Sequence, residues 1–228
     1  MSLDERQVDL FSRQILLREV GGKGQERLLG SRVLLLGSGP AAEAAGTYLA
    51  GAGLRTLGLR RAADLESLGF APLAERCPET RVDPLENRHE RLALAAWDVV
   101  VEVDGAEASA GPVGRARRGS VRISRDDERG TTLLIVPARS GGCTHCHAAE
   151  ARVGAQAGRA TGTTRVAASD ATVDAMLAGD LAALAALDLL LDLDPTSVAR
   201  AFRLLPGAPA FTSSAALLLD HCPRACRA

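Results

Sequence analysis

The sequence predicts an α/β fold, a doubly wound sheet that is parallel in its N-terminal half and antiparallel in its C-terminal half. In the first half, apolar strand-like runs alternate with helical segments, which is the pattern of βαβ units. In the second half, pairs of strand-like runs are joined by polar or Gly- and Pro-containing turns, as in hairpins. The 228 residues suffice for one sizeable domain with its own core.

The elements follow in order along the chain. An arm at 4–29 has apolar residues at helical spacing, broken at Gly21 and Gly22. Strands are expected at 32–36, 54–59, 80–84, 98–103, 121–124 and 131–137, and helices at 41–52 and 87–96. The stretch between the second and third strands has weak periodicity and is predicted as a connection, and 148–169 as a loop. The longest helix is expected at 171–191, and a last hairpin pairs 198–204 with 211–218.

Composition and charge limit the classes of function. Hydrophobic residues make up 46% of the chain, which excludes disorder throughout. The net charge of −1 gives no overall field that would attract nucleic acid or a membrane. The N-terminal residues are charged and lack the apolar run of a signal peptide, so we expect a cytoplasmic protein. We divide its single domain, 1–228, into an arm (1–30), a core (31–140) and a C-terminal half (141–228).

A glycine loop follows the first strand. Gly37 and Gly39 stand between that strand and a helix, where backbone N–H groups of a Rossmann-like fold bind phosphate. Pro40, directly after them, suits the first turn of a helix but removes one N–H donor. At the end of the second strand, Arg60 and Arg61 stand where an acidic residue normally binds the ribose. The glycine loop therefore predicts a nucleotide-binding fold, whereas Pro40, Arg60 and Arg61 argue against nucleotide binding in this chain.

Several segments together resemble the ThiF/MoeB/HesA family, adenylating enzymes related to ubiquitin activators. They are FSRQILLREVGGKGQERLLG and the following SRVLLLGSG, YLAGAG at 48–53, WDVVVEVD at 97–104, and then a CxxC, a long helix and C-terminal cysteines in the family's order. The resemblance implies a homodimer that binds ATP and Mg²⁺ and adenylates the C-terminal glycine of a ubiquitin-like or sulfur-carrier protein. It also implies that Arg13 reaches across the dimer toward the γ-phosphate.

The chain departs from this family at the residues that handle ATP. The family's SNLxRQ segment and the lysine that follows it are missing, and Lys23 is the only lysine in the sequence. Asp104 is a candidate for the Mg²⁺ aspartate, although the family register places Gly105 there. Arg165 falls where some members carry a nucleophilic cysteine. We therefore expect a degraded site in which Arg13, Asp104 and the loop glycines are vestigial and ATP/Mg²⁺ binding is doubtful.

Four of the five cysteines form two short motifs, and the fifth, Cys77, is expected to be a packed or partly exposed thiol. Cys143 and Cys146 form CxxC, and Cys222 and Cys226 form CxxxC. Two such pairs brought together would make a closed tetrahedral Zn²⁺ site that holds structure, and the family carries zinc cysteines at the same two places. Reduced thiols or a redox pair are the alternative. Neighbouring His145, His147 and His221 could also act as ligands, although surface positions are the simpler interpretation.

The long helix carries leucines at helical spacing, at 177, 181, 184 and 187. They predict a buried core face, the dimer contact that the family makes in this region, or both.

Three hypotheses follow for function. The first is a non-catalytic member that binds a carrier protein, a peptide or an active homologue. The second is a divergent but active adenylyltransferase. The third is an NADP-dependent enzyme in which Arg61 binds the 2′-phosphate.

Overall fold

The computed structural model describes residues 3–60, 70–85, 96–103, 116–126, 130–140, 171–193, 198–204 and 211–217. Its helices are α1 (Glu5–Leu10), α2 (Ser12–Ile15), α3 (Gly21–Gly30), α4 (Pro40–Gly51), α5 (Phe70–Arg76) and α7 (Ala171–Leu191). Its strands are β1 (Arg32–Leu36), β2 (Thr56–Arg60), β3 (Arg81–Leu85), β4 (Val99–Glu102), β5 (Gly119–Asp126), β6 (Gly130–Pro137), β7 (Ala199–Leu204) and β8 (Phe211–Leu217). No helix in these ranges is long and apolar enough to cross a membrane.

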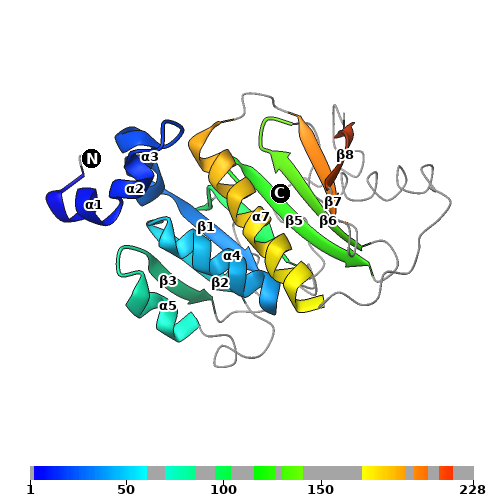
Figure 1. The fold of residues 1–228 in the computed structure, drawn as a ribbon, viewed down its shortest axis with the longest axis horizontal. Coiled ribbons are helices and arrows are strands. Elements are labelled where there is room, and N and C mark those ends of the chain that lie inside the picture. The colour runs from blue at the N-terminus through cyan, green and yellow to red at the C-terminus, as the bar shows by residue number, and fades with distance from the viewer. Residues whose placement is uncertain are drawn as a thin grey trace.

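All eight strands belong to one sheet in the order β3-β2-β1-β4-β5-β6-β7-β8 (Figure 1). The pairs among β1 to β5 are parallel, and the pairs from β5 to β8 are antiparallel. This confirms the predicted mixed sheet. The strand order reverses at β1, between β2 and β4, which is the topological switch point where open α/β sheets bind ligands.

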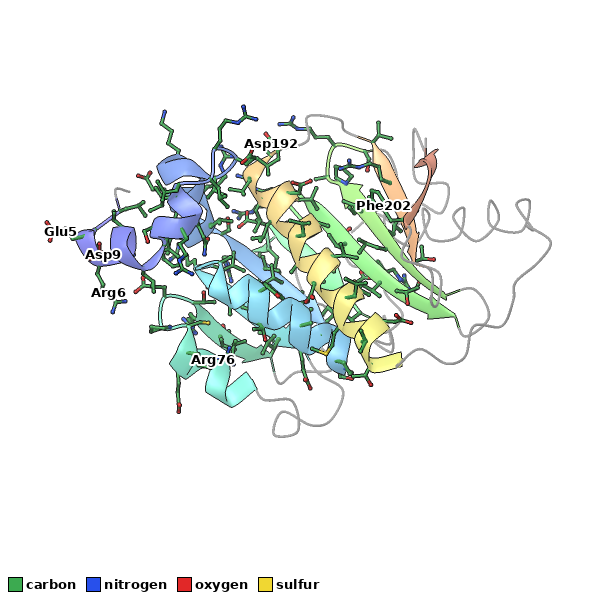
Figure 2. All side chains as sticks on the ribbon, viewed as in Figure 1. Glu5, Arg6, Asp9, Arg76, Asp192 and Phe202 are labelled. Carbon is green, nitrogen blue, oxygen red and sulfur yellow. The ribbon has the colours of Figure 1, made fainter. Side chains whose placement is uncertain are left out.

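Helices α4 and α7 lie side by side across one face of the sheet (Figure 1). Because β1 is covered on both faces, Val33, Leu34 and Leu35 are all almost fully buried, as its continuous apolar sequence predicts. Val33 and Leu35 face the helices, whereas Leu34 packs with Trp97 on the opposite face. At the other end of the sheet, Phe202 of β7 packs against the helix-side core (Figure 2).

Small residues form the contact between α4 and α7. The buried positions of α7 are mostly alanines, and those of α4 are alanines with Gly46 and Leu49. A β-carbon added at Gly179 of α7 would overlap the backbone of Ala41 in α4, so the two helices approach as closely as their backbones allow. The larger Leu177 and Leu184 of α7 lie outside this contact and are exposed.

The N-terminal arm is helical, as predicted, but consists of three short helices. Asp4 caps α1 through the N–H of Gln7, and Gly21 begins α3 with φ +58°. The buried ring of Phe11 lies against Gly53, where an added β-carbon would collide with it. Gln25 is also buried and donates a hydrogen bond of 3.0 Å to the carbonyl of Ala52. These contacts fix the arm to the turn after α4.

The structure also corrects and extends the expected elements. Helix α5 lies within the stretch that weak periodicity had assigned to a connection, and its Leu73 is buried in the core and anchors the helix. Cys77 follows this helix and is partly buried against the core, as expected. The helix predicted at 87–96 and the loop at 148–169 lie mainly or wholly outside the described residues.

Candidate functional site at the carboxyl ends of strands β1 and β4

The glycine loop after β1 has the backbone shape that only glycine adopts easily. Gly37 has φ +120° and Gly39 has φ +86°, both in the region that L-residues avoid. A β-carbon at Gly37 would lie 2.7 Å from the carbonyl oxygen of Val103, so the loop passes directly against the residue after β4. A β-carbon at Gly39 would meet no described atom within 4 Å. The loop is therefore closed on the β4 side and open, among the described residues, above Gly39.

The first turn of α4 begins at this loop. Pro40 occupies its first position, no side chain caps the helix, and the N–H of Glu43 already donates to the Gly39 carbonyl at 3.0 Å. The remaining early N–H groups are those that bind anions in related loops. Because proline has no N–H, this turn offers one donor fewer, as the sequence analysis expected.

The structure does not bring the two cationic residues that sequence reasoning considered to this loop. Lys23 is exposed on α3, which leads into the amino end of β1, whereas the loop follows the carboxyl end. Arg13 is exposed on α2, in the arm that Figure 1 shows at the far side of α3. Within one chain, neither side chain is placed to meet a phosphate at Gly37–Gly39.

The arm that carries Arg13 is tied to its own chain. Arg6 of α1 forms an ion pair with Glu79, in the turn before β3, and Gln7 donates to the same carboxylate at 3.1 Å. Figure 2 shows Arg6 extending from α1 at the outer end of the arm. Gln14, next to Arg13, donates to the carbonyl of Gly51 at 3.3 Å. The arm therefore has a defined position with Arg13 directed to its exposed side.

Several predicted site residues lie outside the described residues. These are Asp104, Arg61, Arg165 and the four motif cysteines Cys143, Cys146, Cys222 and Cys226. Arg60 ends β2, but its side chain is likewise not described. Among the described residues no cluster of His, Cys, Asp or Glu could hold a metal ion. The Mg²⁺, zinc and NADP interpretations therefore stay predictions.

Sequence reasoning missed a charged pair beside the loop. Glu102 of β4 and Arg122 of β5 are in register, and Nη1 of Arg122 lies 3.7 Å from Oε2 of Glu102. The side chain of Glu102 is 13% exposed and that of Arg122 is 21% exposed. Both lie on the sheet face opposite to α4 and α7. In the same row, Leu36 of β1 is the register partner of Glu102 and immediately precedes Gly37.

Burial changes the acidity of this carboxyl group. Desolvation raises the pKa of Glu102 above its ordinary value of 4.5, and the charge of Arg122 opposes part of that rise. A perturbed carboxyl beside a ligand-binding crevice is a usual mark of a functional site. The sequence held a signal for the pair, since Glu102 stands between valines in DVVVEV and Arg122 between Val121 and Ile123 in SVRIS.

The chain is similar in sequence to two curated proteins. Over 126 residues the chain is 32% identical to the SAMP-activating enzyme E1 of Haloferax volcanii, covering 45% of this chain and 47% of that protein. Over 55 residues it is 46% identical to the sulfur carrier protein ThiS adenylyltransferase of Escherichia coli, covering 24% and 22%. These two matches support the ThiF/MoeB/HesA family. No family model matches the chain.

Solved structures support the fold of this ThiF/MoeB-like chain. E. coli MccB crystallised with succinimide superposes with a TM-score of 0.64 at 14% identity, covering 94% of this chain and 72% of MccB. PaaA gives a TM-score of 0.61 at 14% identity, covering 93% and 83%. Matches to the two curated relatives span less than half of each relative's length. The comparisons therefore support the family and show the fold, and activity, substrate and partner are matters for proposal.

Proposed function

We propose that this ThiF/MoeB-like chain has a degraded ATP site and acts as a non-catalytic binding partner for a carrier protein or peptide. The observation that carries the proposal is the position of Lys23, the only lysine, at the opposite end of β1 from the glycine loop. The first and last residues of β1 alone are about 13 Å apart, at about 3.3 Å per residue. A lysine side chain cannot span that distance to a phosphate at Gly39.

Two further departures from the family's ATP site also argue against ATP binding. Pro40 removes a phosphate donor, and the sequence places Arg61 where an acid would bind the ribose. Loss of one preorganised electrostatic contact costs about 3 kcal/mol of transition-state stabilisation. Several such losses together would lower an adenylation rate by many orders of magnitude, while the fold that binds the partner would persist.

Pyrophosphate exchange into ATP tests this proposal. The purified chain is incubated with ATP, Mg²⁺, labelled pyrophosphate and candidate carrier proteins, with the ThiS adenylyltransferase of E. coli and ThiS as the positive control. We expect exchange in the control and none with this chain. Exchange that depends on one carrier protein and disappears with its C-terminally amidated form would overturn the proposal.

A divergent, active adenylyltransferase is the second candidate. One observation favours it: Gly37 and Gly39 keep the positive φ angles of a phosphate loop, and the described residues leave the space above Gly39 open. In that case an arginine would supply the charge of the missing lysine. The same exchange assay separates the two candidates, because only the second gives carrier-dependent exchange.

The kind of partner follows from the relatives. Their names describe activation of SAMP and adenylation of the sulfur carrier ThiS, so we propose a carrier protein or peptide tail as the ligand of this chain. An active homologue is an alternative partner. The cytoplasmic location expected from the sequence stays a prediction.

We further propose a homodimer formed through α7. Val173, Met176, Leu177 and Leu184 are each at least 42% exposed and recur at helical spacing, while small residues fill the inner face of the helix. Tyr48 of the adjacent α4 is 59% exposed as well. Exposed apolar side chains gathered on one helix are typical of a protein contact.

Structural zinc remains the proposal for the four motif cysteines. Strands β6 and β8 run in the same direction and end at the same edge of the sheet, because each is antiparallel to β7. In the sequence Cys143 and Cys146 follow β6, and Cys222 and Cys226 follow β8, and the ends of these two strands lie about 10 Å apart. This edge is opposite to the one that carries Gly37–Gly39, which favours a structural over a catalytic role.

A further inference from the structure

The charged pair Glu102–Arg122 lies where an apolar row would be expected. In its row on the sheet, Leu36, Glu102, Arg122 and Leu134 are each the register partner of the next, and the row continues to Arg60 beyond Leu36 and to Ala201 beyond Leu134. The two immediate neighbours of the pair are leucines, and Leu134 is buried. Because a buried charge is costly unless it is well paired, two charges at the centre of this row need a reason beyond packing.

The two charges do not satisfy each other. The 3.7 Å between Nη1 and Oε2 exceeds hydrogen-bond length, so the pair is held by charge attraction alone. A guanidinium group has five N–H donors in a planar fork. Within the described part of the chain no hydrogen bond involves the side chain of Arg122, although about a fifth of that side chain is accessible. Arg122 therefore has donors that no described residue takes up, and a ligand could accept from them.

The position of the pair indicates which ligand could reach it. Glu102 is the last residue of β4 and neighbours Leu36, which leads into the Gly37 loop, so the pair lies beside the topological switch point. We infer that Arg122 binds the free C-terminal carboxylate of a peptide or carrier-protein tail, with Glu102 holding the guanidinium in place. This inference rests on the proposed function, since a partner that is never adenylated keeps its negative carboxylate and needs a cation to bind it.

The chemistry of the site favours a carboxylate over a phosphate. A planar carboxylate accepts two parallel N–H bonds from arginine and carries one charge. A phosphate carries more negative charge, which the adjacent Glu102 would repel. The same repulsion, in weaker form, acts on a carboxylate. Glu102 therefore both positions Arg122 and lowers the affinity of the site.

The test uses two peptide libraries of random sequence, one ending in a free carboxylate and one amidated at the C-terminus. The full-length chain is immobilised, and the retained peptides are counted by mass spectrometry. We expect the free carboxylate to be preferred by about tenfold or more, as one charge-assisted bond to arginine implies. We also expect that millimolar inorganic phosphate does not abolish the preference. Equal retention of the two libraries, retention of neither, or full competition by phosphate would each overturn the inference.

Variants separate binding from folding. Arg122→Met should remove the preference for the free carboxylate. The double variant Glu102→Leu with Arg122→Met replaces the pair by apolar groups, a change that buried pairs often tolerate, and should fold but show no preference. If the pair were only a structural salt bridge, every variant that folds would prefer the free carboxylate as strongly as the unchanged chain does. That result would also overturn the inference. Failure here with no nucleotide exchange would leave the proposed function intact.

Discussion

Gly179 of α7 lies directly against the carbonyl group of Ala41 in α4, and a β-carbon at position 179 would overlap that oxygen. This contact holds the long helix over the first turn after the glycine loop, so the shape of the candidate site depends on it. Because the obstacle is backbone, it cannot move aside as a flexible side chain would.

Gly179→Ala should destabilise the fold by about 1–3 kcal/mol or more through overpacking, despite the better helix propensity of alanine. Gly51→Ala is the matched control, because an added β-carbon at Gly51, in the last turn of α4, meets nothing within 4 Å. It should be neutral or stabilising by up to about 1 kcal/mol. Urea unfolding followed by circular dichroism measures both, and equal stability of the two variants would contradict the α4–α7 packing.

The exposed stripe of α7 predicts dimerisation. Leu184→Asp places a charge in the proposed contact and should shift the protein from dimer to monomer in sedimentation equilibrium. Ala74→Asp, at an exposed position of α5, introduces the same charge elsewhere and should leave the dimer intact. A monomeric parent protein, or a Leu184→Asp variant that remains dimeric, would exclude this surface as the interface.

Glu102 predicts a specific dependence of stability on pH. Its pKa is raised in the folded chain, so the folded state holds the proton more tightly than the unfolded state does. The stability from this group is fully present below its ordinary value of 4.5 and is lost as the pH rises through its folded pKa. The free energy of unfolding of the parent should therefore fall relative to that of Glu102→Gln as pH rises.

Chemical denaturation of both proteins between about pH 4 and 8 measures that difference. Glu75→Gln, on the exposed side of α5, reports the effect of removing a carboxylate elsewhere. A difference between the parent and Glu102→Gln that stays constant across the series would contradict the burial of this carboxyl group.

The cysteine motifs predict one bound zinc ion per chain. Cys143→Ser or Cys222→Ser should release the metal and lower stability, because a structural zinc site contributes to folding. Cys77→Ser is the internal control, since Cys77 follows α5 and is far from both motifs in the sequence, and this variant should keep full zinc content. Elemental analysis of the purified proteins decides the matter, and a parent protein without zinc would disprove the site.

The periodicity of the sequence predicted most of the sheet. Strand β1 matched its expected bounds. Its apolar run after Arg32, bounded by Ser31 and Gly37, is typical of a strand that is buried on both faces of a sheet, and Val33, Leu34 and Leu35 are indeed buried. Helix α7 matched as well, but its leucines were ambiguous. In the structure Leu184 is 60% exposed, whereas Leu181 packs against the core. The sequence alone could not separate them, because alanines and not leucines form most of the inner face of the helix.

The candidate site was predictable only in part. The φ angles of Gly37 and Gly39 follow from their place between a strand and a helix. The pairing of Glu102 with Arg122 depends on β5 lying beside β4 in one register, and strand register is not written in either segment alone. Helix α5 was missed because its short turn has too little periodicity to be distinguished from a connection.

Calorimetric titration of the full-length chain with ATP and Mg²⁺ tests the central claim most directly, with the E. coli ThiS adenylyltransferase measured in parallel. If the triphosphate-binding groups are lost, the chain should give no saturable heat at ATP concentrations up to about 1 mM, the upper end of usual enzyme affinities. A saturable isotherm with a micromolar Kd, abolished by Gly39→Val, would contradict the account.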